Sequence, residues 1–239
     1  MGDCLEVMKE INDKSVDMIL CDLPYGTTQC KWDSIIPFNL LWDQYIRIIK
    51  ENGAIILTSS QPFTSALIMS NIGWFKYCWV WDKVKPSGHL NAKKMPMKVH
   101  EDICVFGKRV KYNPIMIPQK ERKSKNYTKN KSDLFGNEKN VERKTSEKYP
   151  NTILSMSNAN QKGKIHPTQK PLDLFEYLIK TYTNEGEIVL DNCIGSGTTA
   201  IAAINTNRNY IGIEKDENYY EIAKNRVLQH SNTNGSTGK

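Results

Sequence analysis

Apolar runs of strand length alternate with stretches whose apolar residues recur at helical spacing. Residues 16–21 form a β-branched and apolar run, whereas residues 38–50 carry helical spacing until Asn52-Gly53 ends it. The predicted strands are residues 16–21, 54–58, 75–81, 102–106, 187–190 and 210–213, and the predicted helices are residues 38–50, 61–69, 171–181, 198–204 and 217–229. This alternation predicts an α/β fold class with a doubly wound, mostly parallel sheet.

The alternation stops between Lys111 and Lys164, where Lys, Asn, Ser and Thr dominate. A compact domain rarely contains so long a stretch without regular structure unless the stretch is functional or disordered. We therefore predict a single domain formed by residues 1–110 and 165–230, an irregular basic insertion at residues 111–164, and a polar tail at residues 231–239.

The positive charge is concentrated in that insertion. The chain has a formal net charge of +7, and thirteen Lys and Arg face five Asp and Glu between Lys108 and Lys148. The rest of the chain is nearly balanced. A basic block fits phosphate-backbone binding, although charge alone favours a solvated lysine-rich loop without a partner. If the chain acts on DNA, Lys120, Arg122, Lys123 and Lys125 are the candidate backbone contacts.

Composition narrows the class of protein further. The hydrophobic fraction of 39% is enough for a packed core, and no apolar run approaches the length of a membrane span. The N-terminal residues are acidic where a signal peptide is basic, so a cytoplasmic protein is expected. The six cysteines contain no C-x-x-C pair and the four histidines are scattered, so no metal site is predicted.

A glycine-rich segment, Asp191 to Thr199, connects a predicted strand to a predicted helix. Open α/β sheets bind ligands at such positions, and Gly195 and Gly197 would let the backbone approach a ligand closely. Glu214 ends the next strand, where an acidic side chain can accept hydrogen bonds from both ribose hydroxyls. The pairing favours a ligand that contains a nucleoside over a simple tight turn.

Two further motifs lie at element boundaries. Asp22-Leu23-Pro24-Tyr25 follows the first strand and combines an acceptor, a rigid turn and a flat aromatic face. His166 to Pro171 precedes a helix. Read alone, the first is an ordinary turn and the second is a helix N-terminal signal with Pro171 in the first turn.

Taken together, the motifs resemble those of the permuted, beta-class amino-methyltransferases of DNA. That family has a catalytic D-P-P-Y motif, a target-recognition region, H-P-T-Q-K-P and a cofactor loop, in this order. The chain shows the same order in Asp22 to Tyr25, the basic segment, His166 to Pro171 and Asp191 to Thr199, and Gly2-Asp3 matches a G-D motif that precedes the catalytic strand. The resemblance covers nearly all of the chain outside residues 111–164.

The resemblance implies a Rossmann-like fold that binds S-adenosyl-L-methionine. It implies catalysis by Asp22, Leu23, Pro24 and Tyr25; Leu23 replaces the usual first proline but has the same backbone carbonyl. It places Thr168 and Lys170 at the methionine end and Asp3 near the adenine. The cofactor residues that it implies are Asp3, Thr168, Lys170, Asp191, Cys193, Gly195, Gly197, Thr198 and Glu214.

The implied reaction is site-specific methylation of adenine N6 in double-stranded DNA, because the related motif with Asp first is associated with adenine. Tyr25 would stack on a flipped base. An N4-cytosine enzyme is the alternative within the class, and a DNA-binding protein with a vestigial site is the alternative of another class. The expected partner is duplex DNA and not a membrane. A homodimer and a companion restriction endonuclease stay open.

Overall fold

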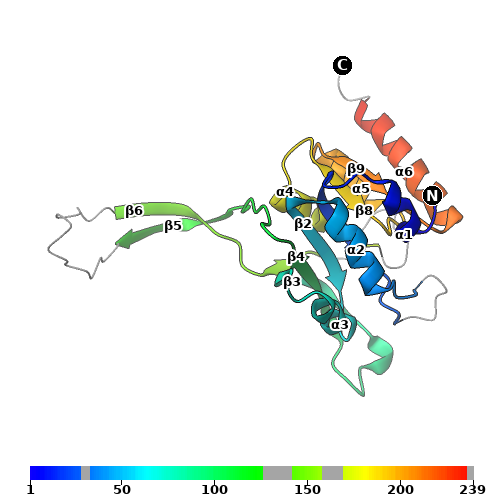
Figure 1. Cartoon of the computed structure of the whole chain (residues 1–239). Coiled ribbons are helices and arrows are strands. Elements are labelled where there is room, and N and C mark those ends of the chain that lie inside the picture. Colours follow the sequence, from blue (N-terminus) through cyan, green and yellow to red (C-terminus); the bar gives the residue numbers. More distant parts are fainter. Residues whose placement is uncertain (28–32, 126–141, 158–168, 236–239) are drawn as a thin grey trace. The chain divides into compact units, whose positions relative to one another are not determined.

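The computed structural model describes residues 1–27, 33–125, 142–157 and 169–235 (Figure 1). The chain divides into a main unit, Met1–Asn113 with Thr152–Lys239, and a ribbon unit, Pro114–Asn151. None of the described helices is long and apolar enough to cross a membrane.

The main unit is built on a seven-stranded sheet with the order β7-β3-β4-β2-β1-β8-β9. Its strands are β1 (Val16–Asp22), β2 (Ile49–Ser59), β3 (Phe75–Ser87), β4 (Lys98–Phe106), β7 (Ile153–Ser155), β8 (Ile188–Asp191) and β9 (Asn209–Gly212). The pairs β1–β2, β1–β8, β8–β9 and β3–β7 are parallel, whereas β4 is antiparallel to both neighbours. The doubly wound, mostly parallel α/β prediction is confirmed.

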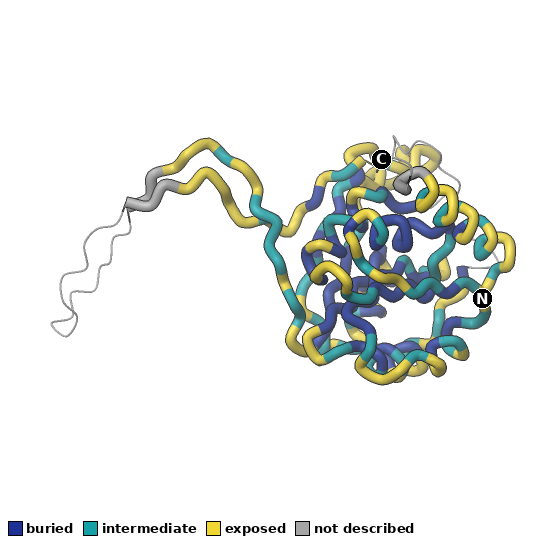
Figure 2. Tube along the Cα trace, turned by 90° about the horizontal axis from the view of Figure 1, so that it is seen from above, coloured by how far each residue is buried: buried dark blue, intermediate teal, exposed yellow. Residues whose placement is uncertain are grey.

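Helices cover both faces of this sheet. They are α1 (Cys4–Val7), α2 (Phe38–Ile48), α3 (Phe63–Ser70), α4 (Leu172–Tyr182), α5 (Thr198–Asn205) and α6 (Glu217–Gly235), with the short 3₁₀ helices η1 (Met8–Glu10) and η2 (His89–Asn91). Side chains of α1, α2 and α3 pack into one core, and those of α4 and α5 pack into the other. Figure 2 shows buried residues running through the centre of the main unit and exposed residues along α6.

Strand β1 explains why the sheet needs two covered faces. Ile19 and Cys21 belong to the core of α1, α2 and α3, whereas Met18 and Leu20 belong to the core of α4 and α5. Successive side chains of a strand point to opposite faces, so a continuous apolar run is stable only where both faces are buried.

The insertion differs from the prediction of an irregular segment at residues 111–164. The ribbon unit contains β5 (Ile117–Lys125) paired antiparallel with β6 (Glu142–Lys148). Strand β7 lies inside the predicted insertion but pairs with β3 at the edge of the main sheet. The described side chains of β5 and β6 are mostly exposed, and these strands lack the apolar alternation that reveals a half-buried strand in sequence.

Candidate active site

The carboxyl ends of the parallel strands bring the sequence motifs to one edge of the sheet. Strand β1 ends at Asp22, β8 ends at Asp191, and the turn after β9 contains Glu214. The segment before α4 contributes Lys170 to the same edge, where its ammonium contacts Asp22. Residues 22, 191 and 214 therefore lie along the same edge of the sheet because parallel strands end on the same side, and Lys170 joins them through Asp22.

Asp22 is surrounded by hydrogen-bond donors. Its Oδ1 accepts hydrogen bonds from the hydroxyls of Tyr25, at 2.8 Å, and of Thr58. Its Oδ2 lies 2.8 Å from Nζ of Lys170. A carboxylate accepts about four hydrogen bonds, so these three donors leave room for about one more. The side chain keeps 26% of its surface exposed, which leaves it accessible from the edge of the sheet.

Lys170 is held between two carboxylates. Its Nζ lies 2.8 Å from Asp22 and 3.3 Å from Oε2 of Glu101, and its side chain is 8% exposed. Burial by itself would lower the pKa of Lys170, but the Asp22 and Glu101 carboxylates outweigh it and raise the pKa. Lys83 adds a second ammonium, 3.4 Å from Oε1 of Glu101. The result is an alternating row of charges that begins at Asp22.

The Tyr25 ring is stacked on Phe63, with centroids 5.1 Å apart and planes inclined by 27°. The Lys170 ammonium lies 5.7 Å from the Tyr25 ring centroid. Burial and the neighbouring Asp22 carboxylate raise the pKa of the Tyr25 hydroxyl, so it stays a donor. Asp33 accepts hydrogen bonds from the amides of Gly26, at 2.8 Å, and Thr27, at 2.9 Å, which braces the turn after Tyr25.

The glycine segment forms a tight turn between β8 and α5. Gly195 has a φ of 51° and Gly197 a φ of 83°, both in the left-handed region that favours glycine. A Cβ at Gly195 would approach only the Cys193 carbonyl oxygen, at 3.9 Å, so the backbone there is open to a ligand. A Cβ at Gly197 would lie 3.2 Å from Cα of Ala223 in α6, so that glycine also permits close helix packing.

Buried polar groups hold this turn in place. Asp191 accepts hydrogen bonds from the Cys193 amide, at 3.0 Å, and from the hydroxyl of Thr199. Burial raises the pKa of Asp191 to about 6, although these hydrogen bonds partly oppose the shift. Cys193 lies in the turn and Thr198 is the first residue of α5, where its hydroxyl is 3.3 Å from the Arg226 guanidinium.

Glu214 connects the turn to the N-terminus. Its Oε2 accepts a hydrogen bond from the Gly195 amide at 2.8 Å, and its backbone carbonyl accepts one from the Gly2 amide at 2.8 Å. Asp3 lies alongside, where Nζ of Lys215 is 3.1 Å from its Oδ2 and lowers its pKa. The structure therefore brings Asp3 and Glu214 together.

Several predicted site residues are not brought into this group. Thr168 lies outside the described residues. Lys120 and Arg122 lie on β5 and are exposed; Lys123 and Lys125 also lie on β5, but their side chains are outside the described part of the chain. Lys170 does belong to the group, but its described contacts are Asp22 and Glu101, whereas the motif resemblance places it at the methionine end of the cofactor.

Three residues of the site have no role in the sequence analysis: Thr58, Phe63 and Glu101. Thr58 and Phe63 lie on β2 and α3 and read as ordinary strand and helix residues. Glu101 precedes the apolar run of β4. An acidic residue next to an apolar strand is the feature of the sequence that could have indicated a site residue here. Trp79 and Trp81 of β3 are 3% and 0% exposed, so both belong to the core and not to the site.

Comparison with known protein families identifies the family of this chain. A family model described as DNA methylase, of the N6/N4 type, matches residues 16–225. The chain belongs to this DNA methylase family. It therefore carries out methyl transfer to DNA with S-adenosylmethionine as its cofactor.

Curated relatives and solved structures agree with this assignment. The methylase is 28% identical to the Type II methyltransferase M.HpaI of Haemophilus parainfluenzae, over 95% of this chain and 72% of the relative. It is 31% identical to M.BglII of Bacillus subtilis, over 93% of this chain and 66% of that relative. The M1.HpyAVI structure, solved with S-adenosylmethionine, has a TM-score of 0.62 at 27% identity and matches 94% of this chain and 96% of its own.

A more distant structure shows only the shared fold. The cytosine-N4-specific PvuII DNA methyltransferase superposes with a TM-score of 0.65 at 16% identity, over 97% of this chain and 90% of its own.

The residues of the methylase fit this cofactor. The open backbone at Gly195 would accommodate a ligand that a side chain would exclude. The Glu214 carboxylate, oriented by the amides of Gly195, Lys215 and Asp216, keeps acceptor capacity for ribose hydroxyls. The cofactor supplies an electrophilic methyl group when it is bound.

Gly197→Ala tests the close packing of this turn. The positive φ and the approach to Ala223 should lower the free energy of unfolding by about 1–3 kcal/mol and weaken cofactor binding, because the turn must shift. Gly186→Ala is the matched control, since Gly186 also has a positive φ, of 79°, but open space around its Cβ. Urea unfolding and calorimetric titration measure both effects. Equal cofactor affinity in the two variants would contradict the assignment of this turn.

Asp191→Asn tests the buried carboxyl. The pKa of Asp191 is raised to about 6, above its unfolded value, so its stabilising contribution is present at low pH and is lost as pH rises through about 6. The free energy of unfolding of Asp191→Asn relative to wild type should therefore rise by about 2–3 kcal/mol between about pH 4 and pH 7. Urea unfolding without cofactor measures it, with the exposed Asp43→Asn as the charge control. A difference that does not change with pH would refute the explanation.

Proposed function

We propose that the methylase transfers the methyl group to the N6 amino group of adenine in duplex DNA. The observation that carries the proposal is Asp22, a carboxylate at the end of β1 with acceptor capacity left beside the cofactor turn. The D-P-P-Y-like motif with Asp first supports adenine over cytosine as the target base.

The amino group of adenine is a poor nucleophile because its lone pair is delocalised into the ring. Asp22 and the Leu23 carbonyl supply two acceptors for its N–H groups, which draws the nitrogen toward tetrahedral geometry and favours the positive charge that develops on it. With the cofactor bound, the nitrogen lone pair would form the new N–C bond as the methyl–sulfur bond breaks, the sulfur would keep that electron pair as a neutral thioether, and the surplus amine proton would pass by way of the Asp22 carboxylate to solvent. Pro24 keeps the turn rigid, so the acceptors are held in position before the base arrives.

The charged row around Asp22 supports this role. Lys170 holds Oδ2 of Asp22 in place and, with its raised pKa, stays protonated while the base binds. The Glu101 carboxylate lies against the same ammonium, so Lys170 does not take up all of the acceptor capacity of Asp22. Thr58 and Tyr25 orient Oδ1 from the opposite side.

The target base must leave the duplex to reach Asp22, and Tyr25 is proposed to stack on it. The ring lies three residues after Asp22 and remains partly exposed, with Phe63 supporting it. Base–aromatic stacking of this kind holds a flipped base without reading its sequence. Phosphate contacts from the ribbon unit, through Lys120, Arg122, Lys123 and Lys125, are part of the same proposal.

Asp22→Ala should lower methyl transfer by about 10²–10³-fold, because it removes the acceptor for the developing charge. Cofactor affinity should change by less than about threefold, since the hydrogen bonds of Asp22 within the described part of the chain are to Tyr25, Thr58 and Lys170 and not to the glycine turn. Single-turnover kinetics and calorimetric titration measure the two quantities. Asp43→Ala, an exposed carboxylate on α2, is the control. Undiminished transfer by Asp22→Ala would overturn the mechanism.

The target base is identified by incubating the methylase with labelled S-adenosylmethionine and genomic DNA, then digesting the DNA to nucleosides. We expect the label in N6-methyldeoxyadenosine. Label only in N4-methylcytosine would refute the adenine assignment and leave the methyl transfer intact. Sequencing of methylated DNA from cells that express the protein locates the recognition sequence for the kinetic assays.

A further inference from the structure

The connection between β3 and β4 has a role that the methyl-transfer site does not explain. We propose that this β3–β4 tip, residues 84–99, is a second DNA contact, in which lysines bind phosphates and Leu90 enters the base stack beside the target. The proposal rests on the proposed function, because it concerns the same duplex.

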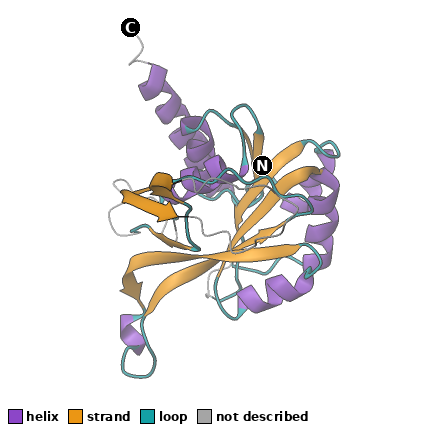
Figure 3. Ribbon diagram, turned by 90° about the vertical axis from the view of Figure 1, so that its left-hand side faces the viewer, coloured by secondary structure: helices purple, strands orange, loops and turns teal. Residues whose placement is uncertain are grey.

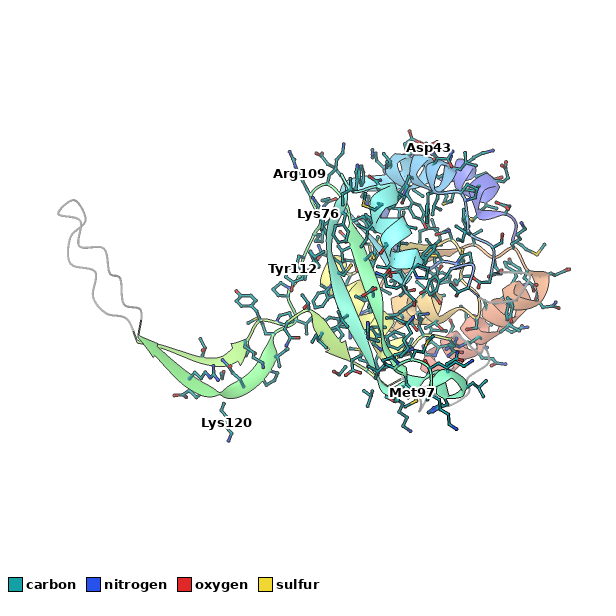
Figure 4. The ribbon with its side chains drawn as sticks, turned by 90° about the horizontal axis from the view of Figure 1, so that it is seen from below. Asp43, Lys76, Met97, Arg109, Tyr112 and Lys120 are labelled. Carbon is teal, nitrogen blue, oxygen red and sulfur yellow. The ribbon has the colours of Figure 1, made fainter. Side chains whose placement is uncertain are left out.

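The β3–β4 tip lies at the catalytic edge of the sheet. Strands β1, β2 and β3 run in one direction, since β4 is antiparallel to both β2 and β3, so the end of β3 lies on the side where β1 ends at Asp22. Figure 3 shows the tip projecting beyond the ends of the long strands β3 and β4. Figure 4 shows Met97, in the tip, and Lys76, near the start of β3, at opposite ends of the strands.

Ion pairs connect the base of the tip to the site. Nζ of Lys83 lies 3.3 Å from Oγ of Ser87 and 3.4 Å from Oε1 of Glu101. Oε2 of Glu101 lies 3.3 Å from Nζ of Lys170, which is bound to Asp22. The tip is therefore anchored through the charged row that orients the catalytic carboxylate.

The backbone at the base of the tip is held in a strained conformation. Val84 has a φ of 64°, a left-handed value that a β-branched residue rarely adopts. Its amide donates a hydrogen bond to Oδ1 of Asp82 at 2.8 Å, and Oδ2 of Asp82 accepts one from Ser155 at 3.0 Å. Such strain persists only where surrounding contacts hold it, and here it coincides with the irregular pairing of β3 with β4 between Asp82 and Ser87.

The tip exposes large apolar side chains instead of burying them. Leu90 is 100% exposed, at the centre of η2, and Met95 is 59% exposed. Val84, Met97 and Val99 are also exposed. A cluster of exposed apolar residues marks an interaction site more often than single residues do.

The charge around these apolar residues indicates which kind of partner they bind. Residues 83–100 contain five lysines and neither Asp nor Glu. Lys85, Lys93, Lys94 and Lys98 are exposed, and the first three form no ion pair with any described residue. Proteins that bend or open DNA combine basic side chains for the phosphates with an apolar side chain inserted between base steps. A base flipped toward Asp22 leaves a gap in the stack that Leu90 is placed to fill.

Leu90→Ala tests the insertion in full-length protein. On a duplex with the recognition sequence, kcat/KM should fall about tenfold or more, because the gap left by the base is no longer filled. On the same duplex with a mismatch opposite the target base, the loss should be less than about threefold, since that base is already unpaired. Ile72→Ala is the matched control: Ile72 is 58% exposed and lies between α3 and the start of β3, at the opposite edge.

The lysines are tested by salt dependence. In the double variant Lys93→Ala/Lys94→Ala, the negative slope of log affinity against log salt should become shallower by about one unit for each phosphate that the protein no longer neutralises. Fluorescence anisotropy on duplex DNA measures this slope. Lys76→Ala, an exposed lysine near the start of β3, should leave the slope unchanged.

The outcomes separate this proposal from the proposed function. Equal losses for Leu90→Ala on the paired and mismatched duplexes, or no loss on either, would overturn the insertion while wild-type methylation still supported the enzyme assignment. An unchanged salt slope in the lysine variant would overturn the phosphate contacts. Label in cytosine would refute adenine as the target but leave the insertion testable on the same duplex. Preference of the wild type for RNA over duplex DNA would overturn both.

Discussion

The arrangement of the site depends on the burial of the Lys170 ammonium between the carboxylates of Asp22 and Glu101. Removing a charge from water costs several kcal/mol, and the cost is offset only where opposite charges lie close and well oriented. This requirement joins three distant segments: the end of β1, the start of β4 and the approach to α4. Anything that displaces one of them leaves a buried charge without its partner.

The same constraint links the cofactor turn to the catalytic turn. Lys170 lies just before α4, whose side chains pack against the sheet, while Gly195 and Gly197 lie in the turn that precedes α5. Glu214 then fixes the glycine turn from β9 through the Gly195 amide. In the proposed function, the methyl donor and the Asp22 carboxylate would thus be held by one rigid sheet edge, which would supply the alignment that methyl transfer needs.

Most of the main unit was predictable because β1 and β2 are buried on both faces and α2 and α4 on one. Their apolar runs and helical spacing record that burial directly. The ribbon unit and β7 were not predictable in this way. The described side chains of β5 and β6 are mostly exposed and show no apolar alternation, and β7 is too short for periodicity, with only Leu154 buried among its residues. The pairing of such strands is set by backbone hydrogen bonds, which leave little trace in side-chain type.

The sequence by itself determined the order of the motifs, the acidic residue at the end of β1, the glycine turn and the basic segment. Those features depend on local chemistry: a carboxylate, a residue without Cβ, a run of lysines. Only the tertiary structure decided that Lys170 bonds to Asp22, that Glu101 and Thr58 complete the site, and that the β3–β4 tip shares its edge. Those contacts join residues far apart in the chain, and their partners are chosen by strand order and direction, which no local pattern encodes.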